Sequence, residues 1–264
     1  MRLPIVQIDA FARAPFEGNP AAVMPLDAWL DDDVLQKIAA ENNLSETAFL
    51  VASDDEGVDF DLRWFTPADE VRLCGHATLA SGHFVLSSQP DRGLVHFRTR
   101  KAGILTVSRA GDDYELALPA WPPRPEPLPE IVAALGVEAV QTLYREGGYR
   151  VVVVADETTV RGLDPDLRKL AEGGDRQTIV TAPGDSTDIV TRMFAPGAGI
   201  DEDPVTGSAH AVIVPYWAKR LGRNAFTAYQ ASARGGHLAC RLEDDRVILG
   251  GACVTVLEGT FFLP

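Results

Sequence analysis

Cysteine is scarce in this sequence, and its placement excludes two common roles. The 264 residues include three cysteines, Cys74, Cys240 and Cys253, and no C-x-x-C spacing. An odd number without that spacing indicates neither a disulfide framework nor a zinc knuckle. The histidines also lack the spacing of zinc ligands, so we expect no metal.

Other signals are missing as well. No apolar stretch approaches the length of a membrane helix, and Gln7 and Asp9 interrupt the start too early for a signal peptide. The sequence has neither a glycine-rich dinucleotide loop nor a phosphate loop with lysine, so we expect no cofactor. Its formal charge of -14 argues against nucleic acid or an anionic membrane as a partner. We expect a cytoplasmic protein that acts on a small molecule.

The sequence does contain an internal repeat with an offset of half its length. Residues in the first half recur about 132 positions later with the same type, an offset read directly from the numbering. The matched pairs are Gly75 and Gly207, Ala77 and Ala209, Gly103 and Gly235, Arg109 and Arg241, and the dipeptides Asp112-Asp113 and Asp244-Asp245. Such a long offset predicts two related domains, and ligands often bind between domains.

The repeat continues upstream of each glycine. Arg63-x-Phe65-x-Pro67 matches Arg192-x-Phe194-x-Pro196, and the second copy has additional residues between its proline and its glycine. Asp203 lies among these additional residues, next to Pro204. It is either an ordinary turn residue or part of a site.

Proline places the domain boundary. Residues 118–129 are too rich in proline for the interior of a helix or strand and predict a stiff linker. We therefore expect an N-terminal domain over residues 1–117 and a C-terminal domain over residues 130–254, with a last strand near residues 255–264 that returns to the first domain.

Strand patterns dominate, and the predicted class is α+β. Apolar residues at helical spacing after Asp31 predict a helix that ends near Asn42-Asn43. Each Gly-x-Ala opens a largely apolar helix, over Gly75 to Leu86 and over Gly207 to Leu221, and Pro215 should kink the second.

The two glycine turns are candidate anion sites. Backbone N–H groups are free at the start of a helix, and glycine lets a ligand approach them closely. Two such turns facing one cleft would bind a carboxylate and stabilise the charge that develops beside it. Alternatively, the glycines only allow close packing.

Few side chains beside the turns offer chemistry. Glu46 is a carboxylate between apolar neighbours, where burial would suit it to proton transfer, or it is a solvated loop residue. Cys74 is either a base with a depressed pKa or a small buried residue. Ser208 and His210 are two positions apart on a helix, so they point in different directions and do not indicate a hydrolase triad.

Several motifs together resemble the PhzF family of phenazine biosynthesis-like isomerases, and the resemblance spans nearly the whole chain. These motifs are Asp9-Ala10-Phe11, Gly18-Asn19-Pro20-Ala21-Ala22-Val23, Asn43-Leu44-Ser45-Glu46-Thr47-Ala48-Phe49, Arg63-Trp64-Phe65-Thr66-Pro67, Leu73-Cys74-Gly75-His76-Ala77-Thr78-Leu79-Ala80, Glu202-Asp203-Pro204-Val205-Thr206-Gly207-Ser208-Ala209-His210, Arg234-Gly235-Gly236 and Val256-Leu257-Glu258-Gly259.

The resemblance implies a diaminopimelate-epimerase-like fold. In this fold, two pseudo-symmetric domains each wrap a curved mixed sheet around a central helix, and the active site lies between them. The phenazine enzyme of the family is a homodimer that isomerises trans-2,3-dihydro-3-hydroxyanthranilate without a cofactor.

The resemblance also implies roles for individual residues. Glu46 would be the acid/base that moves a proton between substrate carbons. The remaining site residues would be His76, Asp203 and Ser208, the backbone of Gly75 and Gly207, and Asn19 as a substrate contact.

One departure bears on mechanism. The related epimerases use one cysteine before each glycine, whereas this chain has Cys74 before the first and Thr206 before the second. Threonine cannot serve as a thiolate, which disfavours racemisation by two thiols. A cofactor-independent isomerase of a small carboxylate is the leading hypothesis. The alternatives are a catalytically weak binding protein that retains the cleft and an epimerase or racemase that uses Cys74.

Overall fold

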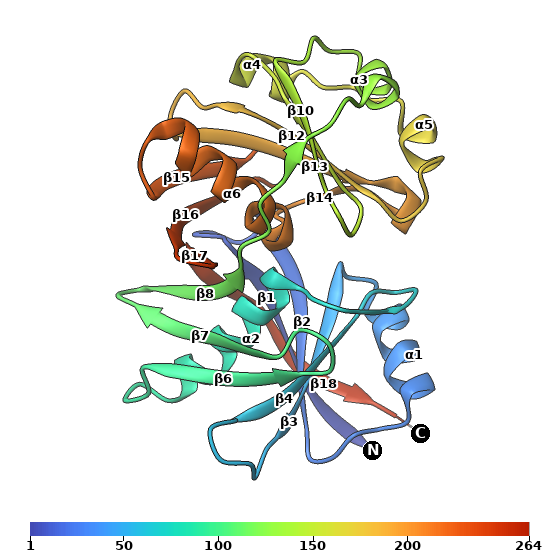
Figure 1. The fold of residues 1–264 in the computed structure, drawn as a ribbon. Helices are drawn as coiled ribbons and strands as arrows, with labels where there is room; N and C mark the ends of the chain where they lie inside the picture. Colours follow the sequence, from blue (N-terminus) through green and yellow to red (C-terminus); the bar gives the residue numbers. More distant parts are fainter. Residues whose placement is uncertain (264) are drawn as a thin grey trace. The chain divides into compact units, whose positions relative to one another are not determined.

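The computed structural model describes residues 1–263, which form two compact units (Figure 1). Unit 1 comprises residues 1–117 together with the chain from residue 250 onward, and unit 2 comprises residues 118–249. Pro264, at the end of the expected last strand, lies outside the described residues.

Unit 1 is a mixed sheet with two helices. Its elements are β1 (Arg2–Ala10), β2 (Asn19–Leu26), α1 (Asp32–Asn42), β3 (Glu46–Ala52), β4 (Phe60–Phe65), β5 (Glu70–Val71), α2 (Gly75–Ser88), β6 (Leu94–Thr99), β7 (Ile104–Ala110), β8 (Asp113–Pro119, which contains the unit boundary) and β18 (Cys253–Phe262). The strands follow the order β18-β1-β2-β3-β4-β6-β7-β8, and β5 pairs with β4. Only the pairs β2–β3 and β4–β6 are parallel within this order. Helix α1 lies in the crossover connection from β2 to β3, and α2 lies in the one from β4 to β6.

Helix α2 is the centre of unit 1. It contacts β1, β2, β3, β6, β7 and β18, so strands surround it (Figure 1). Gly82 shows how closely it approaches the sheet, because a Cβ atom there would lie 2.3 Å from Cγ1 of Val107 in β7. A central helix of this kind must be apolar on most faces, as its sequence is.

Unit 2 contains the remaining elements. They are β9 (Arg124–Pro125), α3 (Pro129–Leu135), β10 (Gln141–Arg145), β11 (Tyr149–Val153), α4 (Glu157–Arg161), α5 (Leu167–Ala171), β12 (Gln177–Pro183), β13 (Ile189–Ala195), the 3-10 helix η1 (Pro196–Ala198), β14 (Ile200–Asp203), α6 (Gly207–Leu221), β15 (Ala225–Gln230), β16 (Gly236–Glu243) and β17 (Arg246–Gly251, at whose end unit 2 gives way to unit 1).

The sheet of unit 2 repeats the sheet of unit 1. Its order is β9-β10-β11-β12-β13-β15-β16, with β14 paired to β13. The pairs β11–β12 and β13–β15 are parallel, at the same places as β2–β3 and β4–β6. The repeat in the sequence therefore corresponds to a repeat in strand order.

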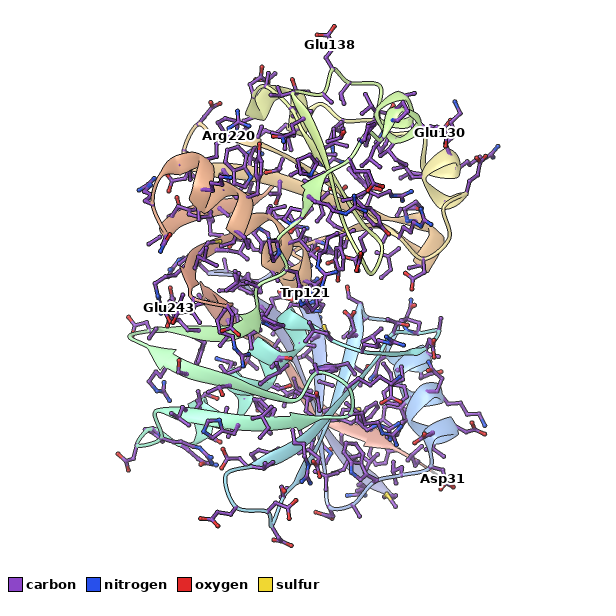
Figure 2. The ribbon with its side chains drawn as sticks, viewed as in Figure 1. Asp31, Trp121, Glu130, Glu138, Arg220 and Glu243 are labelled. Atoms are coloured by element: carbon purple, nitrogen blue, oxygen red, sulfur yellow. The ribbon has the colours of Figure 1, made fainter. Side chains whose placement is uncertain are left out.

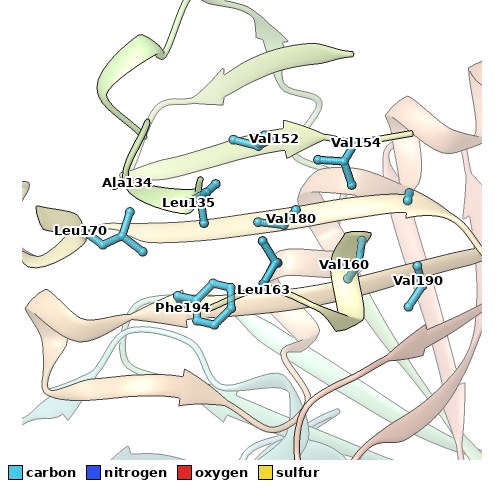
Figure 3. Packing of buried hydrophobic residues seen from close by; sticks show 11 residues of the cluster. Ala134, Leu135, Val152, Val154, Val160, Leu163, Leu170, Val180, Val190 and Phe194 are labelled. Atoms are coloured by element: carbon cyan, nitrogen blue, oxygen red, sulfur yellow. The ribbon is translucent and has the colours of Figure 1, made fainter. Parts of the chain in front are cut away.

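Valine builds much of the core of unit 2. Val152, Val154, Val180 and Val190 are fully buried and pack with Phe194 on one face of β11, β12 and β13 (Figure 3). Strands of a parallel pair are commonly covered on both faces, which accounts for the almost continuous apolar run over residues 151–154.

The proline-rich segment expected as a linker belongs to unit 2. Its β9 pairs with β10, and the Trp121 N–H donates to the carbonyl of Ala211 in α6 at 2.9 Å. Proline is tolerated here because β9 is at an edge of this sheet. The last strand, β18, pairs antiparallel with β1 from Arg2↔Phe262 to Ala10↔Cys253.

The surface carries the acidic excess. Asp31 of unit 1 and Glu130 and Glu138 of unit 2 each project away from the ribbon of their own unit (Figure 2). Among residues 1–263, no helix has both the length and the apolar character needed to cross a membrane.

Candidate active site

Each glycine turn is preceded by the same buried arginine cluster. In unit 1, Nε and Nη2 of Arg63 donate to the two carboxylate oxygens of Glu70 at 2.8 and 2.9 Å, and the guanidinium lies 5.0 Å from the ring of Phe65. A paired, planar contact of this kind fixes both geometry and charge. It ties β4 to β5, the short strand that leads into the turn.

Unit 2 repeats this cluster. Arg192 donates to both carboxylate oxygens of Glu202 at 2.7 and 2.9 Å and lies 4.9 Å from the ring of Phe194. The glutamate partner also follows the repeat, because Glu70 and Glu202 are separated by the same offset as Gly75 and Gly207, a match that the sequence analysis did not use. The shared arginine cluster explains why the repeated Arg-x-Phe-x-Pro motif accompanies each turn.

The turn of unit 1 brings ionisable groups together. Glu46 begins β3 and is largely buried, and its Oε2 lies 3.1 Å from Nε2 of His76. On the other side of the imidazole, Nδ1 lies 3.1 Å from the amide of Asn19 and 3.5 Å from Sγ of Cys74. His76 and Cys74 flank Gly75, the first residue of α2. Asn19, Glu46 and Cys74 thus surround the imidazole of His76.

The cluster raises the pKa values of His76 and Cys74. Burial alone would lower the pKa of His76, but its contacts with Cys74 and Glu46 raise it well above 6.5. Burial, and then the charge of Glu46, raise the pKa of Cys74 to about 11. Of the two readings of Cys74, the small buried residue is therefore the one that the structure supports, because the helix start does not offset the loss of water. The thiol is neutral at neutral pH.

The turn of unit 2 carries a hydrogen-bond network around Thr206. Thr206, just before Gly207, donates its hydroxyl to the carboxylate of Asp203, and its N–H donates to Oε1 of Gln230 at 2.9 Å. Nε2 of Gln230 donates to the Asp203 carbonyl at 2.7 Å and to the Thr206 hydroxyl at 3.1 Å. Asp203 is buried at the end of β14, which pairs with β13 as β5 pairs with β4, so Asp203 occupies the place of Val71 and is not one of the extra residues.

Ser208 belongs to a second set of polar groups. Its hydroxyl donates to Oε1 of Gln177 at 3.5 Å, and Tyr149 hydrogen-bonds to both side chains. Burial raises the pKa of Tyr149 above 10 despite these hydrogen bonds, so its hydroxyl is protonated.

Sequence reasoning missed Tyr149, Gln177 and Gln230. Gln177 begins β12 just as Glu46 begins β3, and β12 and β3 have the same place in their sheets. Aligning strand starts, rather than applying one fixed offset, would have identified Gln177 as the counterpart of Glu46.

His210 has a structural environment. It is fully buried, and its Nδ1 lies 2.8 Å from the carbonyl of Thr206, to which it donates. Burial lowers the pKa of His210 to about 4, so the ring is neutral. The described structure shows a bond from Ser208 to Gln177 and none to His210, in agreement with the expectation that these residues form no triad.

The predicted site residues thus fall into two sets, each described within its own unit. Glu46, His76, Asn19 and Gly75 come together in unit 1. Asp203, Gly207 and Ser208 cluster around the second turn in unit 2. Glu46 is far in sequence from Cys74 and His76. Each of these three residues offers one metal-ligating atom, and the three atoms lie within 4.8 Å of one another. Spacing along the chain did not reveal this group.

The fold is similar to that of epimerases. A hydroxyproline epimerase from Agrobacterium vitis has the same fold, with a TM-score of 0.65 over 98% of this chain and 92% of that one, at 12% identity. This likeness and the duplicated sheets around central helices confirm the predicted α+β, epimerase-like class.

The family follows from closer matches. The family model for PhzC-PhzF, described as phenazine biosynthesis-like protein, matches residues 8–259. An uncharacterized isomerase of Pseudomonas aeruginosa is 47% identical over the full length of both chains. The crystal structure of a phenazine biosynthesis protein of the PhzF family from Enterococcus faecalis superimposes with a TM-score of 0.91, at 45% identity and full coverage of both chains. The chain belongs to the phenazine biosynthesis-like family and is an isomerase.

Proposed function

We propose that this isomerase moves a proton between carbons of a small carboxylate, without a cofactor, and that Glu46 carries the proton. The observation that carries the proposal is the contact of 3.1 Å between the Glu46 carboxylate and His76 beside the first glycine turn. A general base must be both held in place and accessible. The Glu46 side chain retains 13% exposure, whereas that of His76 retains 4%.

His76 serves as the charged partner in this proposal. Its raised pKa keeps the imidazole protonated, so it stabilises the Glu46 carboxylate before proton abstraction and the negative charge of the substrate after it. The proton taken from one carbon is returned to another, and no electron donor or acceptor is consumed. Asn19 holds Nδ1 of the ring and thereby fixes its orientation.

The groups around the second turn are separately proposed to bind a small carboxylate. The first N–H groups of α6 have no partner within the helix, and the turn at Gly207 lets an anion approach them. Ser208, held by Gln177 and Tyr149, offers a hydroxyl at that helix start. The network of Asp203, Thr206 and Gln230 keeps the turn in shape.

The proposal is tested by proton NMR in deuterated water with a panel of small carboxylates that includes trans-2,3-dihydro-3-hydroxyanthranilate. Wild type should introduce deuterium at a carbon of one substrate, and Glu46→Gln should slow this exchange by about 10²–10⁴-fold, the usual contribution of a general acid/base. Glu41→Gln is the matched control, because it removes an exposed carboxylate from α1 and should leave the rate unchanged.

The other outcomes separate the alternatives. Equal exchange by wild type and Glu46→Gln would exclude Glu46 as the base. Exchange at a single stereocentre without migration of a double bond would favour an epimerase. Binding of a carboxylate without any exchange would favour the binding-protein alternative.

A further inference from the structure

We propose that Glu46, Cys74 and His76 form a binding site for a soft divalent metal ion such as Zn²⁺, and that the bound ion blocks the proton transfer assigned to Glu46. The three side chains offer a carboxylate oxygen, a sulfur and an imidazole nitrogen. This donor set is typical of zinc, and harder ions such as Mg²⁺ and Ca²⁺ prefer oxygen ligands alone.

The three ligand atoms lie close enough together to be drawn onto one ion. Zinc bonds of about 2.0–2.3 Å in a tetrahedral arrangement separate neighbouring ligand atoms by roughly 3.3–3.8 Å, and one atom from each of the three residues lies within 4.8 Å of the others. Glu46 contacts Nε2 of His76 at 3.1 Å, whereas Cys74 contacts Nδ1 at 3.5 Å. One imidazole offers a single nitrogen to an ion, so binding requires Glu46 or Cys74 to turn to the nitrogen that the other contacts.

The surroundings favour a metal over other occupants. Cys74 and His76 are buried, and they lie on either side of Gly75 at the start of a helix that strands enclose. Three protein ligands leave a fourth position for water or for a substrate oxygen, as in zinc sites that are open on one side. All three ligands lie in unit 1, so the site does not depend on residues of unit 2.

The metal and the proton compete for the same atoms. Zinc binds a thiolate and a neutral imidazole nitrogen, so binding releases one proton from Cys74 and one from the imidazolium of His76. The ion also occupies the oxygen of Glu46 that would accept the substrate proton. The inhibition therefore rests on the proposed function, whereas the metal binding does not.

Cobalt titration tests the binding directly. Co²⁺ occupies zinc sites, and its bond to a thiolate gives a charge-transfer absorption in the near ultraviolet. Wild type should develop this absorption with one equivalent of cobalt and lose it when zinc is added. Cys74→Ser should show no such absorption, whereas Cys253→Ser, which removes a partly buried thiol from the same unit, should behave as wild type. Absence of the absorption in folded wild type, or its persistence in Cys74→Ser, would overturn the proposal.

Glu46→Gln provides a second test if Cys74→Ser does not fold. It should keep the sulfur-to-cobalt absorption but bind cobalt at least about tenfold more weakly, since even second-shell changes weaken metal sites by that factor. Unchanged affinity would show that Glu46 is not a ligand. Cobalt binding in a protein that exchanges no substrate proton would support the metal site while refuting the proposed function.

Discussion

The two glycine turns have the same backbone setting, but the side chains beside them differ in whether they are ionisable. In unit 1, Glu46 at the start of β3 contacts His76, the residue after Gly75. In unit 2, Gln177 at the start of β12 contacts Ser208, the residue after Gly207. Glutamate and glutamine have nearly the same shape, so the scaffold is repeated while the carboxylate at this position is present in one copy only.

This difference indicates which of the two units is suited to proton transfer. A neutral amide and a hydroxyl donate and accept hydrogen bonds but do not exchange protons with carbon near neutral pH. A carboxylate beside an imidazolium forms hydrogen bonds and can also exchange a proton with carbon. The duplicated fold thus supports a division of labour, with proton transfer proposed for unit 1 and anion binding proposed for unit 2.

The largest effect is expected from breaking the feature that the two copies share, the arginine cluster. Arg63→Ala removes a guanidinium whose side chain is 4% exposed and leaves the carboxylate of Glu70 without its main partner. We expect it to lower the free energy of unfolding by about 3–5 kcal/mol, the range for breaking a buried ion pair. Urea denaturation measures this loss.

The comparison with the second copy sharpens this prediction. Arg192→Ala should cost less than Arg63→Ala, because the Arg192 side chain is 14% exposed. Arg98→Ala is the control: its side chain is 41% exposed, and a surface pair should contribute less than about 1 kcal/mol. Equal losses for Arg63→Ala and Arg98→Ala would mean that burial of the cluster has no energetic consequence.

A smaller effect is expected from a repeat-matched position at which the two central helices carry different residues. Gly82 of α2 corresponds to Val214 of α6 under the repeat offset, yet a Cβ atom at Gly82 would lie 2.3 Å from Val107. Gly82→Ala should therefore destabilise the protein by about 1–3 kcal/mol through overpacking, as measured by urea denaturation. Gly93→Ala is the matched control, since no atom lies within 4 Å of its added methyl group. A Gly82→Ala protein as stable as Gly93→Ala would show that α2 can shift freely against β7.

The smallest effect concerns the histidines beside the two turns, whose pKa values shift in opposite directions. The pKa of His210 is lowered from 6.5 to about 4. Between those values the unfolded chain binds one more proton than the folded chain, so His210 destabilises the fold as the pH falls through this range. From pH 7 to pH 5 this amounts to roughly 2 kcal/mol at about 1.36 kcal/mol per pKa unit.

His210→Asn should remove this part of the pH dependence, since an asparagine amide can donate to the Thr206 carbonyl without titrating. Urea denaturation of both proteins at pH 7 and pH 5 measures the difference. His76 acts in the opposite sense, because its contribution is present at low pH and is lost only as the pH rises through its raised pKa. Equal pH dependence in wild type and His210→Asn would show that folding does not shift the pKa of His210.

Much of the fold could be predicted from the sequence. The repeat of Gly75 and Gly207, with Arg63 and Arg192 upstream, indicated two related units, each with a helix after its glycine, and the strand order bears out the relation. Local signals are strong here because glycine, proline and an apolar period leave few conformations open.

Only those site residues that lie within recognisable sequence motifs could be predicted. Glu46 and His76 lie in motifs that the family shares, whereas Tyr149 and Gln177 reach Ser208 by long-range pairing of β11 with β12. The charge state of Cys74 could not be predicted, because it depends on burial by segments distant in the sequence. Spacing along the chain also gave no sign that Glu46, Cys74 and His76 converge.

The pairing of β1 with β18 bears on the order in which the protein folds during synthesis. Unit 2 is one continuous stretch, so it can fold as soon as residue 249 has left the ribosome. Unit 1 begins to be made first, but it lacks β18, one of the two strands that pair with β1, until that strand emerges. Until then the edge of β1 is exposed, and a nascent chain with an open edge strand is prone to aggregate or to recruit a chaperone. The half that is proposed to transfer the proton is therefore the half completed last.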